Sequence, residues 1–287
     1  RKADIFMIVV IVWMTCFSFL RTSYNDTWNY IFAWNNSDGA RAFLESGGLL
    51  DLTSNPLSNL WRDISHDISD NYHIYFLLPA LLSSFAVVKL FKKYSVNPAF
   101  SMLIFFSLGT YIVYVAALKQ CFAIFFLLLS IPYAEEKKYV RFYLLVAIAI
   151  LFHTHAFMFL ILPLLFGRPW GSITYLGLLA TIFAMLTYDR TLGAFMEYAQ
   201  SIGALVDEGE VFDGHQINLM RVAVYWIPSI LAFAFRKHLF RESSRSENLF
   251  VNMSTVCAMI LTIGTVQAAN LFARMAAYFE IATAISL

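Results

Sequence analysis

The chain has 287 residues, of which 60% are hydrophobic and only 14% are charged, and its mean hydropathy is +0.65. A soluble domain of this size carries about a quarter charged residues, so the composition excludes an ordinary soluble enzyme and predicts an integral membrane protein. The net charge of +1 argues against a nucleic-acid partner. Cys16, Cys121 and Cys257 lie inside apolar blocks, which indicates buried thiols rather than disulfides or a metal site.

Apolar blocks of membrane-spanning or half-membrane length recur along the chain. They cover residues 5–20, 73–88, 99–116, 120–133, 142–152, 156–166, 171–188, 220–235, 248–266 and 270–287. We therefore predict an all-α polytopic membrane protein with about nine or ten transmembrane or half-membrane helices. We expect one integral membrane domain over residues 1–287. Because the chain starts at Arg1 and is still apolar at Leu287, we expect the natural protein to extend further.

Basic residues indicate the orientation of the chain, because cytoplasmic loops carry an excess of Lys and Arg. Clusters follow the second, fourth and eighth apolar blocks, and we expect all of them inside. The polar stretch 21–72 and the acidic stretch 189–219 then lie outside. The clusters are Lys89, Lys92 and Lys93; Lys137, Lys138 and Arg141; and Arg236, Lys237, Arg241 and Arg245.

The stretch from Phe142 to Phe166 conflicts with this orientation if it is a single span. Its length of about 25 residues, or ~37 Å as a helix, suits one tilted span. A single span would, however, place the last basic cluster outside. Two short helices that turn at His153-Thr154-His155 keep every cluster inside. Neither helix can cross ~30 Å of hydrocarbon, so the turn lies at membrane depth or in a wet cavity. We predict this broken pair, and such turns usually line a site.

With this topology, several ionisable side chains gather at the outer face. Intramembrane charge costs roughly 2.5–3.5 kcal/mol on insertion scales, so such groups are candidates for function. Simpler roles stay open: the arginines and the lysine can anchor helix ends, Asp26 can cap a helix or pair with Arg21, and Glu280 can pair with Arg274. The side chains are Arg21, Asp26, Lys119, His153, His155, Arg221, Arg274 and Glu280.

Aspartates and histidines also recur at roughly helical spacing between residues 63 and 73, at the end of the outer stretch. They match no closed metal-ligand pattern, and we expect no metal site. We favour a solvated amphipathic segment on the outer membrane surface, anchored by Trp61 and Tyr72. The residues are Asp63, His66, Asp67, Asp70 and His73.

Short motifs occur along the chain in an order typical of one family. The motifs are Arg21-x4-Asp26-Thr27-x2-Tyr30, Leu118-Lys119-Gln120-Cys121-Phe122-Ala123, Phe152-His153-Thr154-His155-Ala156 and Arg274-x3-Tyr278-Phe279. In order and spacing they resemble the EpsG/Wzy-like exopolysaccharide polymerases over nearly the whole chain. The sequence departs from that pattern at Lys119, which replaces Arg and loses a bidentate fork. It also departs at His155, which replaces Ser, and just before Asp26, where the usual Gly is absent.

The resemblance implies a membrane glycosyltransferase with an architecture similar to the GT-C class. Such enzymes polymerise undecaprenyl-diphosphate-linked oligosaccharide repeat units into an exopolysaccharide or capsule at the outer face of the bacterial cytoplasmic membrane. The expected partners are the lipid-linked donor and acceptor, the bilayer, a chain-length regulator and a flippase. No cofactor or metal is expected, because arginines can replace a cation at the diphosphate.

The reaction implied by the resemblance sets roles for these residues. Charge grows on the leaving diphosphate and is stabilised by fixed cations, and the acceptor hydroxyl must lose a proton. Asp26, and after it His153, are the catalytic candidates for taking that proton. We expect Arg21, Asp26, His153 and Arg274 to face one cavity open to the outer leaflet. The substrate-binding candidates are Arg21, Tyr30, Lys119, Gln120, His155, Arg221, Arg274 and Tyr278.

Three other functions stay open. A flippase or transporter for the lipid-linked sugar also needs outer-face cations and broken helices, but it should expose polar groups alternately to both sides. An O-antigen-ligase-like transferase would use lipid as its acceptor. A structural membrane subunit would have charges that do not converge.

Overall fold

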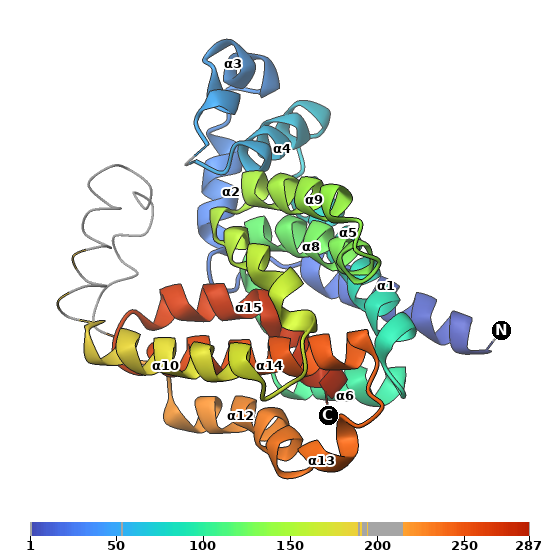
Figure 1. The fold of residues 1–287 in the computed structure, drawn as a ribbon. Helices are drawn as coiled ribbons and strands as arrows, with labels where there is room; N and C mark the ends of the chain where they lie inside the picture. Colours follow the sequence, from blue (N-terminus) through green and yellow to red (C-terminus); the bar gives the residue numbers. More distant parts are fainter. Residues whose placement is uncertain (1, 53, 189, 191–193, 195–214, 287) are drawn as a thin grey trace. The chain divides into compact units, whose positions relative to one another are not determined.

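The structure is a computed structural model, and it describes residues 2–52, 54–188, 190, 194 and 215–286 (Figure 1). The described residues form helices and connecting turns, with no strand among them. The chain divides into two compact units, Arg1–Phe157 and Met158–Leu287, which we describe separately. Most of the predicted acidic loop 189–219 lies outside the described residues.

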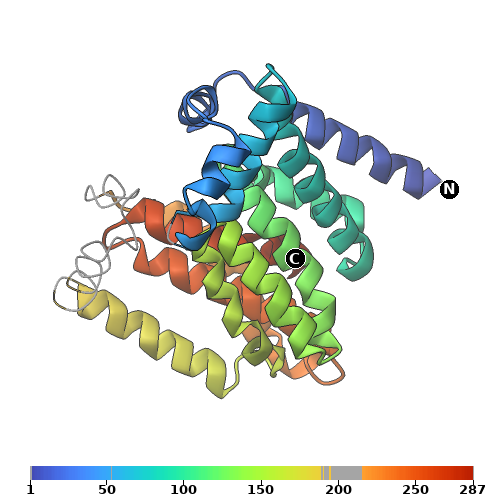
Figure 2. The same cartoon turned by 90° about the horizontal axis from the view of Figure 1, so that it is seen from above.

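The first unit is built on four long helices: α1 (Lys2–Phe19), α5 (His73–Tyr94), α8 (Leu118–Glu135) and α9 (Tyr139–Phe152). Consecutive members of this series pack against each other, and Figures 1 and 2 show α8 and α9 side by side. Ala123, Ala134 and Ala149 are fully buried on α8 and α9. Small side chains allow backbones to approach closely, as is typical of helices packed in membranes.

A break divides the predicted apolar block 99–116. The structure places α6 (Pro98–Ser107) and α7 (Thr110–Ala116) there, with a bend of 63° between them. Gly109 has a φ of 74°, a left-handed conformation that only glycine adopts readily, and it separates the two helices. The apolar pattern predicted the location of this block correctly but not its division.

The predicted outer stretch 21–72 contains α2 (Thr27–Asn35), α3 (Ala40–Glu45), the 3-10 turn η1 (Gly48–Leu50) and α4 (Pro56–Ile68). The predicted amphipathic segment is present as α4, but it is only partly solvated: Asp67 is exposed, whereas Asp63 is buried. Asp63 is 2% exposed and accepts hydrogen bonds from Ser37 (2.6 Å) and Arg62 (2.6 Å). Trp61 packs on Phe122 of α8 instead of anchoring α4 in lipid. Helical spacing predicts an amphipathic face but not which surface covers it.

The predicted break at His153 is present. Helix α9 ends at Phe152, and His153 has extended dihedral angles, with φ −154° and ψ 115°. The chain then continues as η2 (Thr154–Phe166), a 3-10 helix of 13 residues. Runs of 3-10 helix longer than a turn are uncommon because their hydrogen-bond geometry is poor. Side chains from elsewhere therefore have to support this segment.

The second unit contains α10 (Ser172–Leu186), α12 (Leu219–Ala234), α13 (Arg236–Leu239), α14 (Arg245–Ile263) and α15 (Ala269–Ser286). Helix α14 packs against α10, α12 and α15. Leu249, Met253, Cys257 and Leu261, one turn apart along α14, are all fully buried. This unbroken apolar row makes α14 the central helix of the unit. Its first turn is fixed by a capping box between Ser244 and Glu247.

Helices α5, α8 and α14 are long and apolar enough to cross a membrane, and the bent pair α6–α7 can form a fourth span. Several shorter apolar helices accompany them, including α9, η2, α10 and α12. On α1, Ile5, Ile8, Val9 and Val12 are each 55% to 60% exposed, an apolar face suited to lipid. The all-helical fold is thus consistent with the predicted polytopic membrane protein.

Candidate functional site

Arg21 follows the end of α1 and is only 7% exposed. Its Cζ lies 4.5 Å from the Phe76 ring centroid and 5.8 Å from that of Tyr30. Among the described residues, none of its three guanidinium nitrogens has a hydrogen-bond partner. Burial lowers the pKa of Arg21, but an arginine remains protonated in a protein. The site therefore contains a buried positive charge that the described chain does not neutralise.

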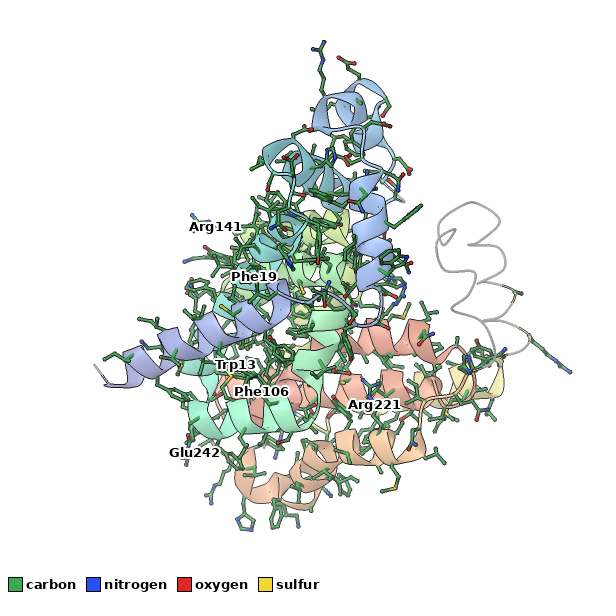
Figure 3. All side chains as sticks on the ribbon, turned by 180° about the vertical axis from the view of Figure 1, so that it is seen from behind. Trp13, Phe19, Phe106, Arg141, Arg221 and Glu242 are labelled. Atoms are coloured by element: carbon green, nitrogen blue, oxygen red, sulfur yellow. The ribbon has the colours of Figure 1, made fainter. Side chains whose placement is uncertain are left out.

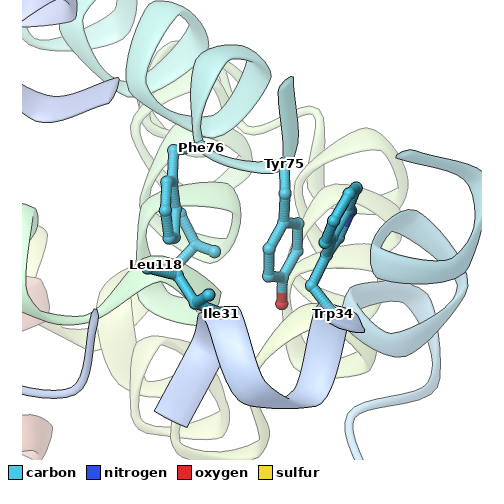
Figure 4. Close-up of a cluster of buried hydrophobic side chains, with 5 residues drawn as sticks. All are labelled: Ile31, Trp34, Tyr75, Phe76 and Leu118. Atoms are coloured by element: carbon cyan, nitrogen blue, oxygen red, sulfur yellow. The ribbon is translucent and has the colours of Figure 1, made fainter. Parts of the chain in front are cut away.

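The surroundings of Arg21 come from helices far apart in sequence. Ile31 and Trp34 of α2 pack with Tyr75 and Phe76 of α5 and with Leu118, the first residue of α8 (Figure 4). This cluster brings the motif that begins at Leu118 next to the motif that begins at Arg21. Cys121, which follows Lys119 and Gln120, is close enough to Arg21 to interact with it electrostatically. Gln120 is buried and Lys119 is half-buried.

Asp26 lies at the N-cap position of α2, but its side chain makes no capping hydrogen bond. It interacts with Arg21 only at longer range, and no ion pair joins the two in the described chain. Neither of the simpler roles considered for Asp26, helix cap or partner of Arg21, is supported. Its carboxylate is half-buried.

The residue before Asp26 has a left-handed backbone. Asn25 has a φ of 44°, in the left-handed region where glycine is favoured. Asparagine is among the few other residues that adopt this region at modest cost. Asn25 therefore adopts a conformation that glycine also favours, in the turn immediately before Asp26.

A cavity of about 600 Å³ lies beside Arg21. Trp13, Cys16 and Phe17 of α1 and the following Leu20 line it, and α7 contributes Ile112 and Val115. Trp13 also contacts Phe106 of α6, with ring centroids 5.4 Å apart (Figure 3). Polar groups occur at one end, where Thr22, Ser23 and Tyr24 follow Arg21 in the chain. The cavity is therefore amphiphilic, with aromatic and aliphatic walls next to hydroxyl groups and a buried cation.

The two predicted histidines lie close together at the break after α9. His153 and His155 are 8% and 4% exposed, and their ring centroids are 5.1 Å apart. The preceding Phe152 stacks on Phe122 of α8, with ring centroids 4.6 Å apart. The break therefore holds a buried imidazole pair against α8, the helix that begins with Lys119 and Gln120.

The second unit holds the remaining predicted residues. Arg221 of α12 donates to Glu280 of α15 at 2.7 Å, and the Glu280 side chain is fully buried. The pairing of Glu280 with Arg221 was not predicted from the sequence, and the pairing of Glu280 with Arg274 stays a prediction. Tyr278 is buried on α15, and Arg274, one turn earlier, is half-buried. Arg221 thus joins α12 to the helix that carries Arg274 and Tyr278.

The structure therefore brings together Arg21, Tyr30 and the start of α8, and separately His153 with His155. The expected common cavity for Arg21, Asp26, His153 and Arg274 involves both units and stays a prediction. Sequence reasoning missed Phe76, whose ring faces Arg21. It also missed Asn55 and Ser58, which contact the break near His153. No sequence signal marks these residues, because each partner lies far along the chain.

Asp67 and His73, two of the predicted aspartates and histidines between 63 and 73, contact backbone groups. Asp67 accepts a hydrogen bond from the Ala40 backbone N–H at 2.9 Å. His73 Nδ1 lies 2.8 Å from the Phe19 carbonyl oxygen. Within the described part of the chain, no group of three or more potential ligands could hold a metal ion.

Comparison with known families agrees with this arrangement of motifs. A model of the EpsG family matches residues 4–287, nearly the whole chain. The chain belongs to the EpsG family. Searches of curated proteins and of solved structures find no match. Membership of the EpsG family confirms the resemblance seen in the motifs and supports a polysaccharide-polymerase type of membrane protein.

Proposed function

We propose that this EpsG-family chain is a membrane glycosyltransferase that polymerises undecaprenyl-diphosphate-linked repeat units into an exopolysaccharide or capsule. The reaction takes place at the outer face of the bacterial cytoplasmic membrane. One observation carries the proposal: the buried, unneutralised Arg21 lies beside an amphiphilic cavity and five positions before Asp26. An isolated buried cation is costly, so its retention indicates an anionic ligand.

The cavity favours a lipid as the carrier of that anion. Its apolar walls from α1 and α7 suit a hydrocarbon chain, whereas the residues from Arg21 to Tyr24 suit a phosphate group. A soluble nucleotide-linked donor would not need the apolar walls. The donor proposed here therefore has a hydrocarbon tail in the cavity and its diphosphate near Arg21.

The chemical step then needs one proton acceptor and one charge stabiliser. The acceptor hydroxyl oxygen attacks the anomeric carbon of the donor, and its proton passes to the Asp26 carboxylate. The bond between the anomeric carbon and the diphosphate oxygen breaks, and the electron pair leaves with the lipid diphosphate. Arg21 stabilises that developing charge, with Lys119 and Arg274 as further cations. His153 is the alternative base.

Elongation of synthetic lipid-linked repeats by the purified protein in nanodiscs tests the proposal. Wild-type protein should form polymer, and Asp26→Asn should abolish it while leaving the fold intact. Asp38→Asn is the matched control, because Asp38 is an exposed carboxylate in the same outer stretch. Full activity of Asp26→Asn would exclude Asp26 as the base, and activity of His153→Gln would then decide the alternative.

The cellular phenotype separates the polymerase from its rivals. Loss of the protein should leave single lipid-linked repeat units on the outer surface of the membrane. Loss of a flippase would instead trap them on the inner surface. Loss of a ligase-like transferase would leave long lipid-linked polymer that is not passed to its final acceptor. Accumulation of repeats on the inner surface would overturn the proposal.

A further inference from the structure

The helix break near His153 is held by a side chain from α4. Asn55 lies at the N-cap position of α4, where an asparagine usually accepts a hydrogen bond from its own helix. Its side chain makes no such bond. Instead, Asn55 Oδ1 accepts from the Thr154 backbone N–H at 2.9 Å and from the Thr154 hydroxyl at 3.2 Å. Asn55 therefore caps the start of η2 rather than its own helix.

A second side chain of α4 holds the other side of the break. Ser58 is 2% exposed, and its hydroxyl donates to the Phe152 carbonyl oxygen at 2.7 Å. The end of a helix leaves carbonyl groups without partners, and the start of the next leaves N–H groups. Asn55 and Ser58 supply one partner on each side of His153. At membrane depth, where water cannot replace such partners, both bonds gain importance.

The same helix is also tied to the other half of the candidate site. Ser65 of α4 accepts a hydrogen bond from Trp34 Nε1 of α2 at 3.1 Å. Trp61 Nε1 donates to the Tyr75 carbonyl oxygen of α5 at 3.0 Å. Helix α4 thus contacts α2, which begins next to Asp26, as well as the histidine-bearing break.

We propose that α4 positions the candidate site, with Asn55 and Ser58 as the positioning residues that fix His153 and His155. This inference rests on the proposed transferase function and deepens it. The φ of Asn55, 58°, lies in the left-handed region, which asparagine adopts more readily than most other residues that carry a Cβ. Neither residue needs to touch the substrate.

Variants at position 55 isolate the side-chain acceptor. Asn55→Gly preserves the left-handed backbone and removes the acceptor, whereas Asn55→Asp preserves an acceptor of the same size. Asn59→Ala is the matched control, because Asn59 lies one turn further along α4 and donates instead to the Ser54 carbonyl oxygen. A misplacement of 1 Å near reacting groups can cost about 100-fold in rate. We expect Asn55→Gly to lower kcat for elongation about tenfold or more.

The pattern across variants distinguishes positioning from general stabilisation. KM for the lipid-linked substrate should change little, and Asn55→Asp should restore most of kcat. Ser58→Ala should lower kcat in the same way, which provides a second test if Asn55→Gly does not fold. Combining Asn55→Gly with Thr154→Ala should cost no more than Asn55→Gly alone, because Asn55→Gly already removes the acceptor of both Thr154 bonds, whereas Thr154→Ala removes only the hydroxyl bond. Equal effects of Asn55→Gly and Asn59→Ala, or unchanged kcat in folded Asn55→Gly and Ser58→Ala, would overturn the proposal.

A readout without turnover separates this inference from the proposed function. Diethylpyrocarbonate modification followed by mass spectrometry reports the accessibility of each histidine. In nanodiscs, Asn55→Gly should accelerate modification of His153 and His155 but not of the more exposed His66, and Asn59→Ala should change none of them. If wild-type protein fails to elongate repeats while this labelling pattern holds, the proposed reaction is wrong and the positioning role stands. Unchanged labelling of both histidines in Asn55→Gly overturns the positioning role.

Discussion

Arg21, which is buried, and Arg221, which is half-buried, show how different the role of one residue type can be. Arg21 has no hydrogen-bond partner in the described chain and lies against the rings of Phe76 and Tyr30. Arg221 donates to the fully buried Glu280 at 2.7 Å. The first arrangement leaves the guanidinium without a hydrogen-bond partner in the described chain, whereas the second pairs opposite charges on two helices. Opposite effects on stability should follow when each arginine is replaced.

Replacing Arg21 by methionine should not destabilise the protein, although it should weaken substrate binding severely. Burying a charge without a partner costs several kcal/mol, and an apolar side chain at this position removes that cost. The lost contact with the Phe76 ring offsets about 2 kcal/mol of this. The Tm of Arg21→Met in nanodiscs should therefore equal or exceed that of wild type, while binding of lipid-linked repeats is lost. A clear drop in Tm with retained binding would show that Arg21 is structural.

Replacing Arg221 by methionine should instead destabilise the second unit. It leaves the Glu280 carboxylate buried without its guanidinium partner, and breaking a buried pair costs about 3–5 kcal/mol. We expect a value near the lower end, because the Arg221 side chain is 36% exposed. The double variant Arg221→Met with Glu280→Gln should recover much of the loss in a denaturation experiment. If the single variant is as stable as wild type, the ion pair does not hold α12 to α15.

Sequence reasoning at this scale identified the unusual residues but not their partners. Arg21 and Asp26 stood out because charges are rare next to apolar blocks. The partner of Glu280 lies 59 positions away, and that of Ser58 lies 94 positions away. Such pairs depend on how the helices pack, and a single sequence does not show which distant residues come into contact.

At the scale of elements, both helix breaks change the direction or type of helix, but only one was predicted. The break at His153 was predicted because it reconciles the basic clusters with one orientation. The break between α6 and α7 depends on Gly109, and a lone glycine inside an apolar run is usually tolerated in a helix. The distribution of basic residues among the loops therefore predicted a helix break that the local sequence alone would not have predicted.

Gly109→Ala tests whether the second break is fixed by the backbone. A side chain at Gly109 would meet no atom within 4 Å, so steric contact should contribute nothing. The φ of 74° should nevertheless cost a residue with a Cβ roughly 1–2 kcal/mol. Thermal unfolding should show that loss for Gly109→Ala and a smaller one for Gly109→Asn, since asparagine tolerates this region better. Equal stability of Gly109→Ala and wild type would mean that the bend does not require a left-handed residue.

At the scale of the whole molecule, η2 has an unusual place. It runs from Thr154 to Phe166, so the boundary between the compact units at Phe157 and Met158 falls inside it. In the first unit its start is capped by Asn55. In the second, Asn252 Nδ2 donates at 2.8 Å to the carbonyl oxygens of Leu165 and Gly167 at its end. Amide side chains thus support a helix type that is rarely this long.

The path of α9 and η2 through the membrane determines the orientation of everything after them. If the two segments together form one span, the basic cluster after α12 lies outside. If they enter and leave on the same side, that cluster lies inside with the others, as we predict from the excess of Lys and Arg in cytoplasmic loops. Cysteine labelling can separate these cases at residues that the structure leaves exposed. Suitable residues are Leu50, Val96 and Leu239, which are 85%, 104% and 55% exposed.

Single cysteines at these positions, in a background without Cys16, Cys121 and Cys257, should react unequally with a membrane-impermeant maleimide. Leu50→Cys should react in intact cells, because it lies in the predicted outer stretch 21–72. Val96→Cys and Leu239→Cys should react only after permeabilisation. Leu239 is chosen because its replacement leaves the surrounding Arg236, Lys237 and Arg241 in place. Reaction of Leu239→Cys in intact cells, with Val96→Cys still protected, would establish a single span and contradict the re-entrant pair. Reaction of Val96→Cys with Leu50→Cys protected would reverse the orientation and exclude an outward-facing site at Arg21.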